Sequence, residues 1–144
     1  MIEEISSEEA LEFFRTLEKE KETFWLDEEQ IASSHILIGD KSGGEIRGIG
    51  GVRKQHSLPV SWIAVKAEHQ NRKVGYNLLH RVNEMAVNRH SFLLATILEQ
   101  NMAAQRIAEK NDYRTAGVLY GRCYLVHPID GLGSLLWWLL VRLF

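Results

Sequence analysis

The sequence predicts a mixed α/β fold in which an antiparallel first half leads into alternating strands and helices. Two apolar runs, residues 35–38 and 46–53, flank a turn-rich stretch and predict a hairpin. A third run, residues 60–66, leads through a short polar loop into a pattern with helical spacing. Residues 92–97 form a run of strand length that is apolar on both faces, as expected of a strand covered by helices on two sides. Residues 101–111 predict another helix.

The composition is that of an ordinary globular protein. The chain has 144 residues, of which 45% are hydrophobic, and no stretch rich in Pro, Ser or charge divides it. This length suffices for one domain with a substantial core, which we expect to span residues 1–144. The net charge of −2 comes from interspersed acidic and basic residues, so the basic surface of a nucleic-acid-binding protein is missing. We expect no nucleic acid among its partners.

The cysteine content and the N-terminal residues bear on the cellular compartment. Cys123 is the only cysteine, so an internal disulfide is impossible and the chain suits a reducing compartment. Residues 1–9 are acidic and lack the basic start and apolar core of a secretory signal. We therefore expect a cytoplasmic protein.

The N-terminal region predicts one strand and two helices. Residues 2–5 have the composition of a short strand, and Ser6 or Ser7 can cap a helix. The apolar face of that helix would comprise Ala10, Leu11, Phe13, Phe14 and Leu17. Residues 27–32 predict a second, short helix. Trp25 can stack on a substrate, but we expect it to be buried in the core.

The hairpin strands are expected to join at residues 40–44, and the next strand to begin after a break at Pro59. Gly48, Gly50 and Gly51 weaken the second hairpin strand, because glycine has no side chain to pack. A β-bulge or a closely bound ligand would make use of the missing side chains, and we expect the bulge.

Residues 65–79 carry the most informative functional pattern, a strand followed by a polar loop and a helix. The first N–H groups of a helix have no intrahelical acceptor, and the positive end of the helix dipole lies there. Both favour a phosphate or pyrophosphate, and Arg72 and Lys73 add positive charge. The apolar residues after the loop share one face of the helix, namely Leu78, Leu79, Val82, Met85 and Ala86. The segment predicts a site for the phosphate tail of a coenzyme.

Written as a pattern, the loop reads Gln70-x-x-Lys73-x-Gly75. It resembles the Gln/Arg-x-x-Gly-x-Gly/Ala signature of the GNAT superfamily of acyl-CoA-dependent N-acyltransferases. This resemblance implies a GNAT-like α/β fold: a mixed, mostly antiparallel twisted sheet with helices on both faces and a splayed central strand pair.

The resemblance continues through the next helix and spans residues 61–113. Asn101-x-x-Ala104 opens this helix. Asp112-Tyr113 follows it, where the family has a Gly-Phe pair.

The resemblance also implies acetyl-CoA as cosubstrate and assigns residues that bind it. Backbone groups near Ile63 and Val65 would bind the pantetheine arm and orient the acyl carbonyl. Asn101 would contact the same arm while it also caps its helix, a role that asparagine performs well. The pyrophosphate would be held by N–H groups of Gln70, Asn71, Arg72, Lys73, Val74, Gly75 and Tyr76. The implied reaction is direct transfer of an acetyl group to a primary amine of a small molecule or peptide.

Two departures from the family pattern affect the backbone and the chemistry. Lys73 replaces the first glycine, so this position either avoids a left-handed conformation or costs about 1 kcal/mol. Ala108 stands where many members have a tyrosine that protonates the departing thiolate, and alanine has no proton to donate. Tyr120 and Tyr124 are the substitute candidates for this catalytic acid. If no residue substitutes, the alternative function is a catalytically weak or inactive CoA-binding or regulatory module.

The reaction also needs a group that accepts a proton from the amine. A carboxylate or histidine acting through water serves when its pKa lies near the working pH. Titratable residues near predicted strand ends are the candidates, and they are Glu45, His35, His56 and Glu99.

Three other kinds of site are not supported. The six histidines do not form a ligand-spaced cluster with Cys123 or with paired carboxylates, so we expect no metal site. A Cys-His nucleophile needs a spatial arrangement that the sequence does not disclose, and a lone cysteine is more often a small buried hydrophobe. A dinucleotide site lacks its glycine triplet and the acidic residue about 20 positions later.

Residues 131–144 form an apolar tail with a single charge. The tail is shorter than the roughly 20 apolar residues that span a membrane. It can form a final strand in the sheet, face a partner or second subunit, or anchor the protein at a membrane surface. We expect packing in the sheet or a homodimer through this tail, and membrane contact is disfavoured but left open.

Overall fold

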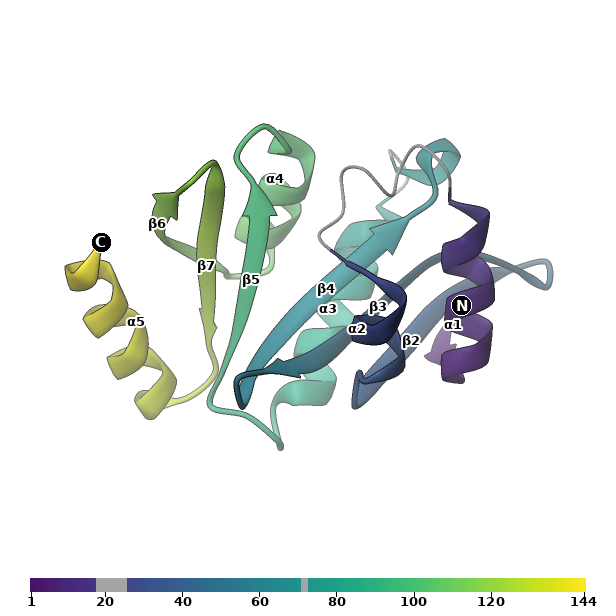
Figure 1. Cartoon of the computed structure of the whole chain (residues 1–144). Coiled ribbons are helices and arrows are strands. Elements are labelled where there is room, and N and C mark those ends of the chain that lie inside the picture. Colours follow the sequence, from purple (N-terminus) through teal and green to yellow (C-terminus); the bar gives the residue numbers. More distant parts are fainter. Residues whose placement is uncertain (18–25, 71–72) are drawn as a thin grey trace.

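A computed structural model describes residues 1–17, 26–70 and 73–144. Seven strands form one sheet in the order β1-β2-β3-β4-β5-β7-β6, and only the β4–β5 pair is parallel (Figure 1). The strands are β1 (Ile2–Glu4), β2 (Ile36–Ser42), β3 (Glu45–Gln55), β4 (Leu58–Val65), β5 (Phe92–Leu98), β6 (Arg114–Leu119) and β7 (Arg122–Pro128). The predicted mixed, mostly antiparallel sheet is confirmed.

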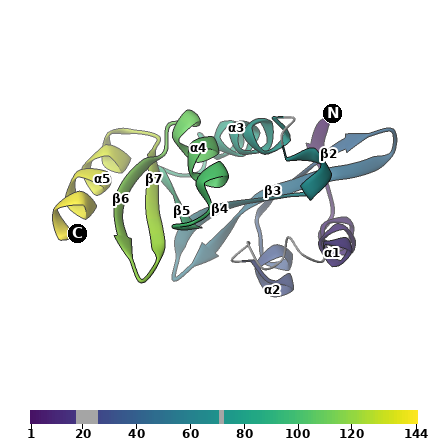
Figure 2. The ribbon, with the colours of Figure 1, turned by 90° about the horizontal axis from the view of Figure 1, so that it is seen from above.

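Helices cover both faces of this sheet, as predicted (Figure 2). They are α1 (Ser7–Thr16) and α2 (Glu28–Ala32) on one face, α3 (Val74–Ala86) and α4 (Met102–Lys110) on the other, and α5 (Gly131–Leu143) against β6 and β7. A short 3₁₀ helix, η2 (Ala67–His69), leads from β4 towards α3. Two apolar cores result, one beneath α1 and α2 and a larger one beneath α3 and α4.

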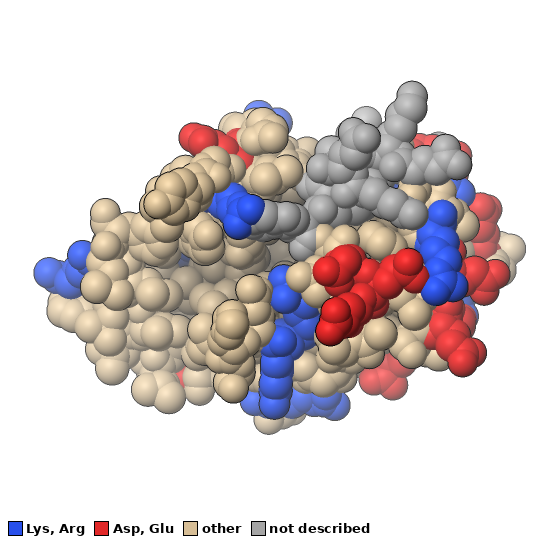
Figure 3. Space-filling model, in the orientation of Figure 1, with Lys and Arg blue, Asp and Glu red and all other residues tan. Residues whose placement is uncertain are grey.

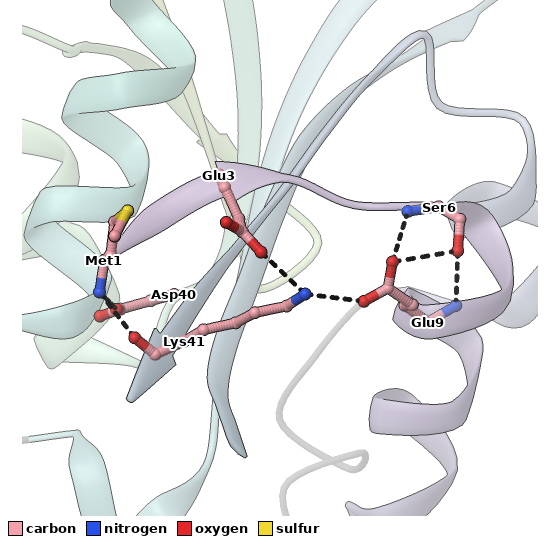
Figure 4. A network of polar contacts seen from close by, with 6 residues as sticks. All are labelled: Met1, Glu3, Ser6, Glu9, Asp40 and Lys41. Atoms are coloured by element: carbon pink, nitrogen blue, oxygen red, sulfur yellow. Dashed lines mark hydrogen bonds and ion pairs between the residues drawn. The ribbon is translucent and has the colours of Figure 1, made fainter. Parts of the chain in front are cut away.

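Polar contacts join β1, β2 and the start of α1 (Figure 4). The Nζ of Lys41 lies 2.8 Å from a carboxylate oxygen of Glu3 and 2.9 Å from one of Glu9. The hydrogen bond from Lys41 lowers the pKa of Glu9. Ser6 caps α1, because its hydroxyl accepts the Glu9 N–H at 3.1 Å while the Glu9 carboxylate accepts the Ser6 N–H at 3.3 Å. Of the two predicted caps, Ser6 is the one used.

Two details of the first strands differ from the predictions. The β2–β3 turn is shorter than expected, since β2 continues to Ser42 and β3 begins at Glu45. Pro59 lies inside β4, opposite Lys54, and does not break the strand. Proline is tolerated there because the peptide groups of the strand alternate in direction, which turns the Pro59 nitrogen away from β3. A β-bulge is present at Arg47, which has no partner in the β2–β3 register, but Gly50 and Gly51 pair regularly, so the bulge does not explain them. A Cβ at Gly51 would overlap the Ile36 carbonyl oxygen.

The apolar tail forms a helix, so the prediction of a final strand is wrong. Asp130 begins α5 as its N-cap, with Oδ1 accepting the N–H groups of Leu132 at 3.0 Å and Gly133 at 3.1 Å. A continuous apolar run has no periodicity that separates helix from strand, and here the cap decides. One face of α5 packs on β7, and the exposed large side chains include Leu132, Leu135, Trp138, Leu139 and Leu143. Coverage of that exposed face by a second subunit stays a prediction.

No helix in the described ranges is long and apolar enough to cross a membrane.

Two glycines of α5 provide a test of how this helix is seated. A methyl group at Gly133 would overlap the carbonyl oxygen of Ser91, whereas one at Gly131 would meet open space. We expect Gly133→Ala to lower the free energy of unfolding by about 1–3 kcal/mol through overpacking. Gly131→Ala, the control, should leave it unchanged or raise it by up to about 1 kcal/mol. Urea denaturation measures both, and equal effects would contradict this packing.

Candidate functional site

A cleft of about 1390 Å³ passes through the sheet where β4 and β5 separate. In the described part of the chain these strands pair only at Val60 and Leu94, and beyond that point they diverge. On the α3/α4 face, the lining includes Ile63, Val65, Gly75, Asn101 and Ile107. On the α1/α2 face, it includes Gln30, Arg53, Trp62, Thr96 and Tyr124.

The backbone of β4 turns hydrogen-bonding groups towards this cleft. The Lys66 N–H donates to the Arg47 carbonyl at 3.0 Å, so the peptide of Lys66 points to β3. Peptide directions alternate along an antiparallel strand, and those of Val65 and Ile63 therefore point to the β5 side. The Val65 carbonyl accepts the side-chain amide of Gln70 at 3.2 Å, consistent with that direction. Because no β5 residue pairs with Ile63, its polar groups are available to a ligand.

The first turn of α3 lies at one mouth of the cleft and offers free amides. Asn77 is the first residue of the helix region whose N–H donates to a carbonyl within that turn, that of Lys73 at 3.0 Å. In the ranges 26–70 and 73–144, no residue accepts the N–H groups of Val74, Gly75 or Tyr76. Such amides, together with the helix dipole, make an anion site.

Gly75 brings this turn close to both walls of the cleft. A Cβ there would lie 3.0 Å from the Cδ1 of Ile107 in α4 and 3.2 Å from that of Ile63 in β4. The Gln70 N–H, also predicted to bind pyrophosphate, donates instead to the Ala67 carbonyl at 3.3 Å. Asn71 and Arg72, two further predicted ligands, lie outside the described residues.

Two positions where the resembling pattern has glycine keep a left-handed backbone. Lys73 has φ of 60° and Asp112 has φ of 66°. Lys73 therefore adopts the conformation that a glycine would adopt more easily, at a cost of about 1 kcal/mol, and it makes no side-chain cap to α3. The loop shape thus persists although the glycine residues do not.

This strain can be measured with two variants at one position. Both Lys73→Gly and Lys73→Ala remove the long side chain, and only alanine keeps the steric cost of positive φ. We expect the glycine variant to be more stable than the alanine variant by about 1 kcal/mol in urea denaturation. A more stable alanine variant would show that the backbone at this position is not left-handed.

Asn101 and Ala108 lie where the sequence pattern places them on α4. The Oδ1 of Asn101 accepts the Ala104 N–H at 3.2 Å, so Asn101 is the N-cap of α4 while it also lines the cleft. Ala108 lines the cleft too and is buried, and its carbonyl accepts the Tyr113 N–H at 3.0 Å. A methyl group here supplies no proton to any ligand.

The family model of the Acetyltransferase (GNAT) family matches residues 2–113. The chain belongs to this family. Solved structures with the same fold include a putative acetyltransferase, yncA, from Salmonella typhimurium with its cofactor acetyl-CoA (TM-score 0.73, 14% identity, 91% of this chain and 94% of that chain covered). An N-acetyltransferase from Staphylococcus aureus Mu50 has a TM-score of 0.74 at 13% identity, with 90% of this chain and 98% of that chain covered.

A further structure is the ribosomal-protein-S18-alanine N-acetyltransferase from Escherichia coli, with a TM-score of 0.71 at 16% identity and 90% of this chain and 94% of that chain covered. No curated protein matches the sequence. The predicted family membership and GNAT-like fold are confirmed.

Of the predicted acids in this GNAT chain, Tyr124 lies at the cleft and Tyr120 does not. Tyr124, in β7 opposite Thr96, lines the cleft, and its ring centre lies 5.8 Å from that of Phe144. Tyr120 is 90% exposed in the β6–β7 turn with φ of 52°, and it is absent from the lining. Cys123 points to the core, where burial raises the pKa of its thiol.

Of the four candidate bases, only His56 lines the cleft. Glu45 has a 70% exposed side chain that lies 3.7 Å from the Nζ of Lys66. Glu99 follows β5, where its N–H donates to the Gly121 carbonyl at 2.9 Å. His35 lies beside His90, and neither is part of the lining.

The imidazoles of His35 and His90 are in direct contact, with 2.8 Å between their Nε2 atoms. Burial and the nearby cations Lys54 and Arg89 lower the pKa of both rings. Because the pKa of each ring is lowered in the folded protein, the two imidazoles bind protons more readily in the unfolded state once the pH falls below 6.5.

The contribution of the histidine pair to the free energy of unfolding should therefore be complete above pH 6.5 and should be lost as the pH falls below it. We expect this pH dependence to be weaker in His90→Gln, and unchanged in the control His80→Gln on the exposed surface of α3. Denaturation with urea on both sides of pH 6.5 measures it. Greater stability at the lower pH would contradict this account of the histidine pair.

A buried polar network lies where β4 and β5 begin to separate. The Ser61 hydroxyl donates to the Leu94 carbonyl of β5 at 3.2 Å and lies 2.7 Å from the hydroxyl of Tyr113. The Tyr113 hydroxyl in turn lies 2.9 Å from the Oδ1 of Asn83 in α3. Burial raises the pKa of Tyr113, which keeps it protonated. The network ties β4, β5 and α3 together just before the cleft opens.

Sequence reasoning missed the cleft residues Arg53, Trp62 and Thr96. Each occupies a predicted strand. Whether its side chain faces the cleft depends on where β4 and β5 stop pairing, which the sequence does not reveal. The alternation of side chains along β3 and β4 places Arg53 and Trp62 on the same face of the sheet, and that signal was available.

Proposed function

We propose that the chain transfers the acetyl group of acetyl-CoA to a primary amine of a small molecule or peptide by direct attack. The observation that supports this most strongly is the cleft between the diverging strands β4 and β5, which begins at the free amides of α3 and continues to the opposite face of the sheet. Such a passage lets a coenzyme and an acceptor approach one another from opposite faces.

The residues present suit acetyl-CoA. The amides of Val74, Gly75 and Tyr76 would hold the pyrophosphate, and the positive end of the α3 dipole would add to their attraction. The cleft-facing peptide of Ile63 would hold the pantetheine arm and the acyl carbonyl, with Asn101 across from it. The coenzyme supplies the activated acetyl thioester.

On the acceptor side, Tyr124 and His56 are the proposed proton-transfer groups. The phenol of Tyr124 would hold the proton that the departing thiolate takes, the role left open by Ala108. His56 is the one predicted base that lines the cleft, and because it lies in the β3–β4 turn, roughly 16 Å or more along β4 from Ile63, a chain of waters would have to carry the amine proton to it. Tyr120, Glu45, His35 and Glu99 are dropped from the proposal because none of them lines the cleft.

A second candidate function is a CoA-binding or regulatory module with little or no catalysis, favoured by the methyl group of Ala108 at the place of the usual acid. For either function we propose a cytoplasmic setting, where a single free cysteine remains reduced and acetyl-CoA is available.

Thiol release from acetyl-CoA, measured across polyamines, amino acids, aminoglycosides and peptides, tests the reaction. We expect turnover with at least one class of amine, and Tyr124→Phe should lower kcat by about 100-fold or more if the phenol is the acid. Tyr120→Phe, a matched change on the same hairpin, should leave kcat unchanged. Calorimetric binding of CoA without turnover on any amine would favour the regulatory module. No heat with CoA would contradict both functions.

A further inference from the structure

Arg53 is a cation on the acceptor side of the cleft, and Asp27 offsets its charge only in part, from beyond ion-pair distance. It lies near the end of β3, opposite Val60, on the sheet face that carries α1 and α2. Its side chain lines the cleft. Elsewhere in β3, by contrast, Arg47 has the Oδ2 of Asp40 at 2.8 Å from its Nη2. Among the described residues, no carboxylate oxygen comes within 4.0 Å of Arg53.

The described hydrogen bonds of Arg53 engage only one of its three guanidinium nitrogens. Nη1 donates to the side-chain oxygen of Gln55 at 3.1 Å. Nε is buried without a partner, and no described residue bonds Nη2. The Nε–Nη2 edge is the fork that binds carboxylate and phosphate oxygens in a bidentate manner. Burial lowers the pKa of Arg53, which reflects a charge removed from water without full compensation.

The described residues around Arg53 supply one carboxylate, and it makes no ion pair with the guanidinium. Asp27 is the only acidic residue in the described lining of the cleft, and its Oδ1 is engaged by the Gln30 N–H at 2.8 Å as the cap of α2. Arg122 also lines the cleft, so two Arg side chains and one acidic side chain lie in its described lining. Lys and Arg atoms gather beside a hollow near the middle of this face, with the acidic side chains to its right (Figure 3).

We propose that Arg53 recognises an anionic group on the acceptor, so that the substrate is an amine that also carries a carboxylate or a phosphate. This inference rests on the proposed acetyl transfer and names its substrate class. An oxyanion that accepts a hydrogen bond from Nη2 would offset the desolvated charge, and a small shift of the side chain would bring Nε within reach of a second oxygen. Amines that carry only positive charge, such as polyamines, would offer Arg53 no anionic group and would add repulsion.

Matched acceptor pairs test this proposal. Lysine and cadaverine differ by a carboxylate, and glucosamine 6-phosphate and glucosamine differ by a phosphate, so the two pairs also separate the two anion classes. With the wild-type protein, we expect a higher kcat/KM for the anionic member of at least one pair. Arg53→Gln should lower that value by about 10- to 100-fold, the effect of losing a charged hydrogen-bond pair, and should spare the other member.

Lys54→Gln provides the control, because it removes the same charge from the next residue, which faces the other side of the sheet. Arg53→Lys should recover part of the activity, since it keeps the charge but not the fork. Equal loss for both members of a pair, or no loss in Arg53→Gln, would overturn the assignment while leaving acetyl transfer intact.

If no amine is acetylated, the proposed function fails and a binding experiment still decides the role of Arg53. Lysine and glucosamine 6-phosphate are then titrated separately into protein that contains CoA, and binding is followed by the shifts of the amide resonances in NMR spectra. Wild type, Arg53→Gln and Lys54→Gln are compared. Binding of either probe that is lost in Arg53→Gln and kept in Lys54→Gln supports the anion site. Binding that is the same in all three proteins, or absent from the wild type, overturns it.

Discussion

The site depends on the separation of β4 from β5 immediately after their one described pair, Val60 with Leu94. A parallel pair that continued further would use the peptide groups of Ile63 and Val65 within the sheet and would close the passage through it. The buried hydroxyls of Ser61 and Tyr113 hold the strands together at the point of divergence. Both halves of the cleft therefore depend on where this pairing stops.

Much of the coenzyme half follows from local sequence signals. The amphipathic pattern of α3, the cap at Asn101 and the polar loop before Val74 each act over a few residues, and they were predicted. The backbone conformation of the loop is kept even where the residue type differs from the family pattern, since Lys73 and Asp112 both have the positive φ expected of a glycine. The point where β4 and β5 separate depends on contacts between segments far apart in the sequence, and no local pattern encodes it.

The failures have this physical origin. Tyr120 and Tyr124 lie four residues apart, and Tyr120 falls in the β6–β7 turn beside Gly121, with φ of 75°, whereas Tyr124 falls within β7 and lines the cleft. A final strand was one of the arrangements expected for the tail, because an unbroken apolar run suits either structure, whereas the cap at Asp130 begins a helix. Arg53 makes no ion pair because Asp27, the acidic residue of the described lining, caps α2 instead, which depends on how α2 packs on the sheet.

The central claim is that main-chain amides at the start of α3 bind a pyrophosphate while β4 binds the attached arm. Amide resonances followed during separate titrations with CoA and with pantetheine, which lacks the pyrophosphate, test it most directly. The account predicts that CoA shifts the amides of Val74, Gly75, Tyr76 and Ile63, and that pantetheine shifts Ile63 but not the three helix residues. Saturable binding of CoA that leaves all four resonances in place would contradict it.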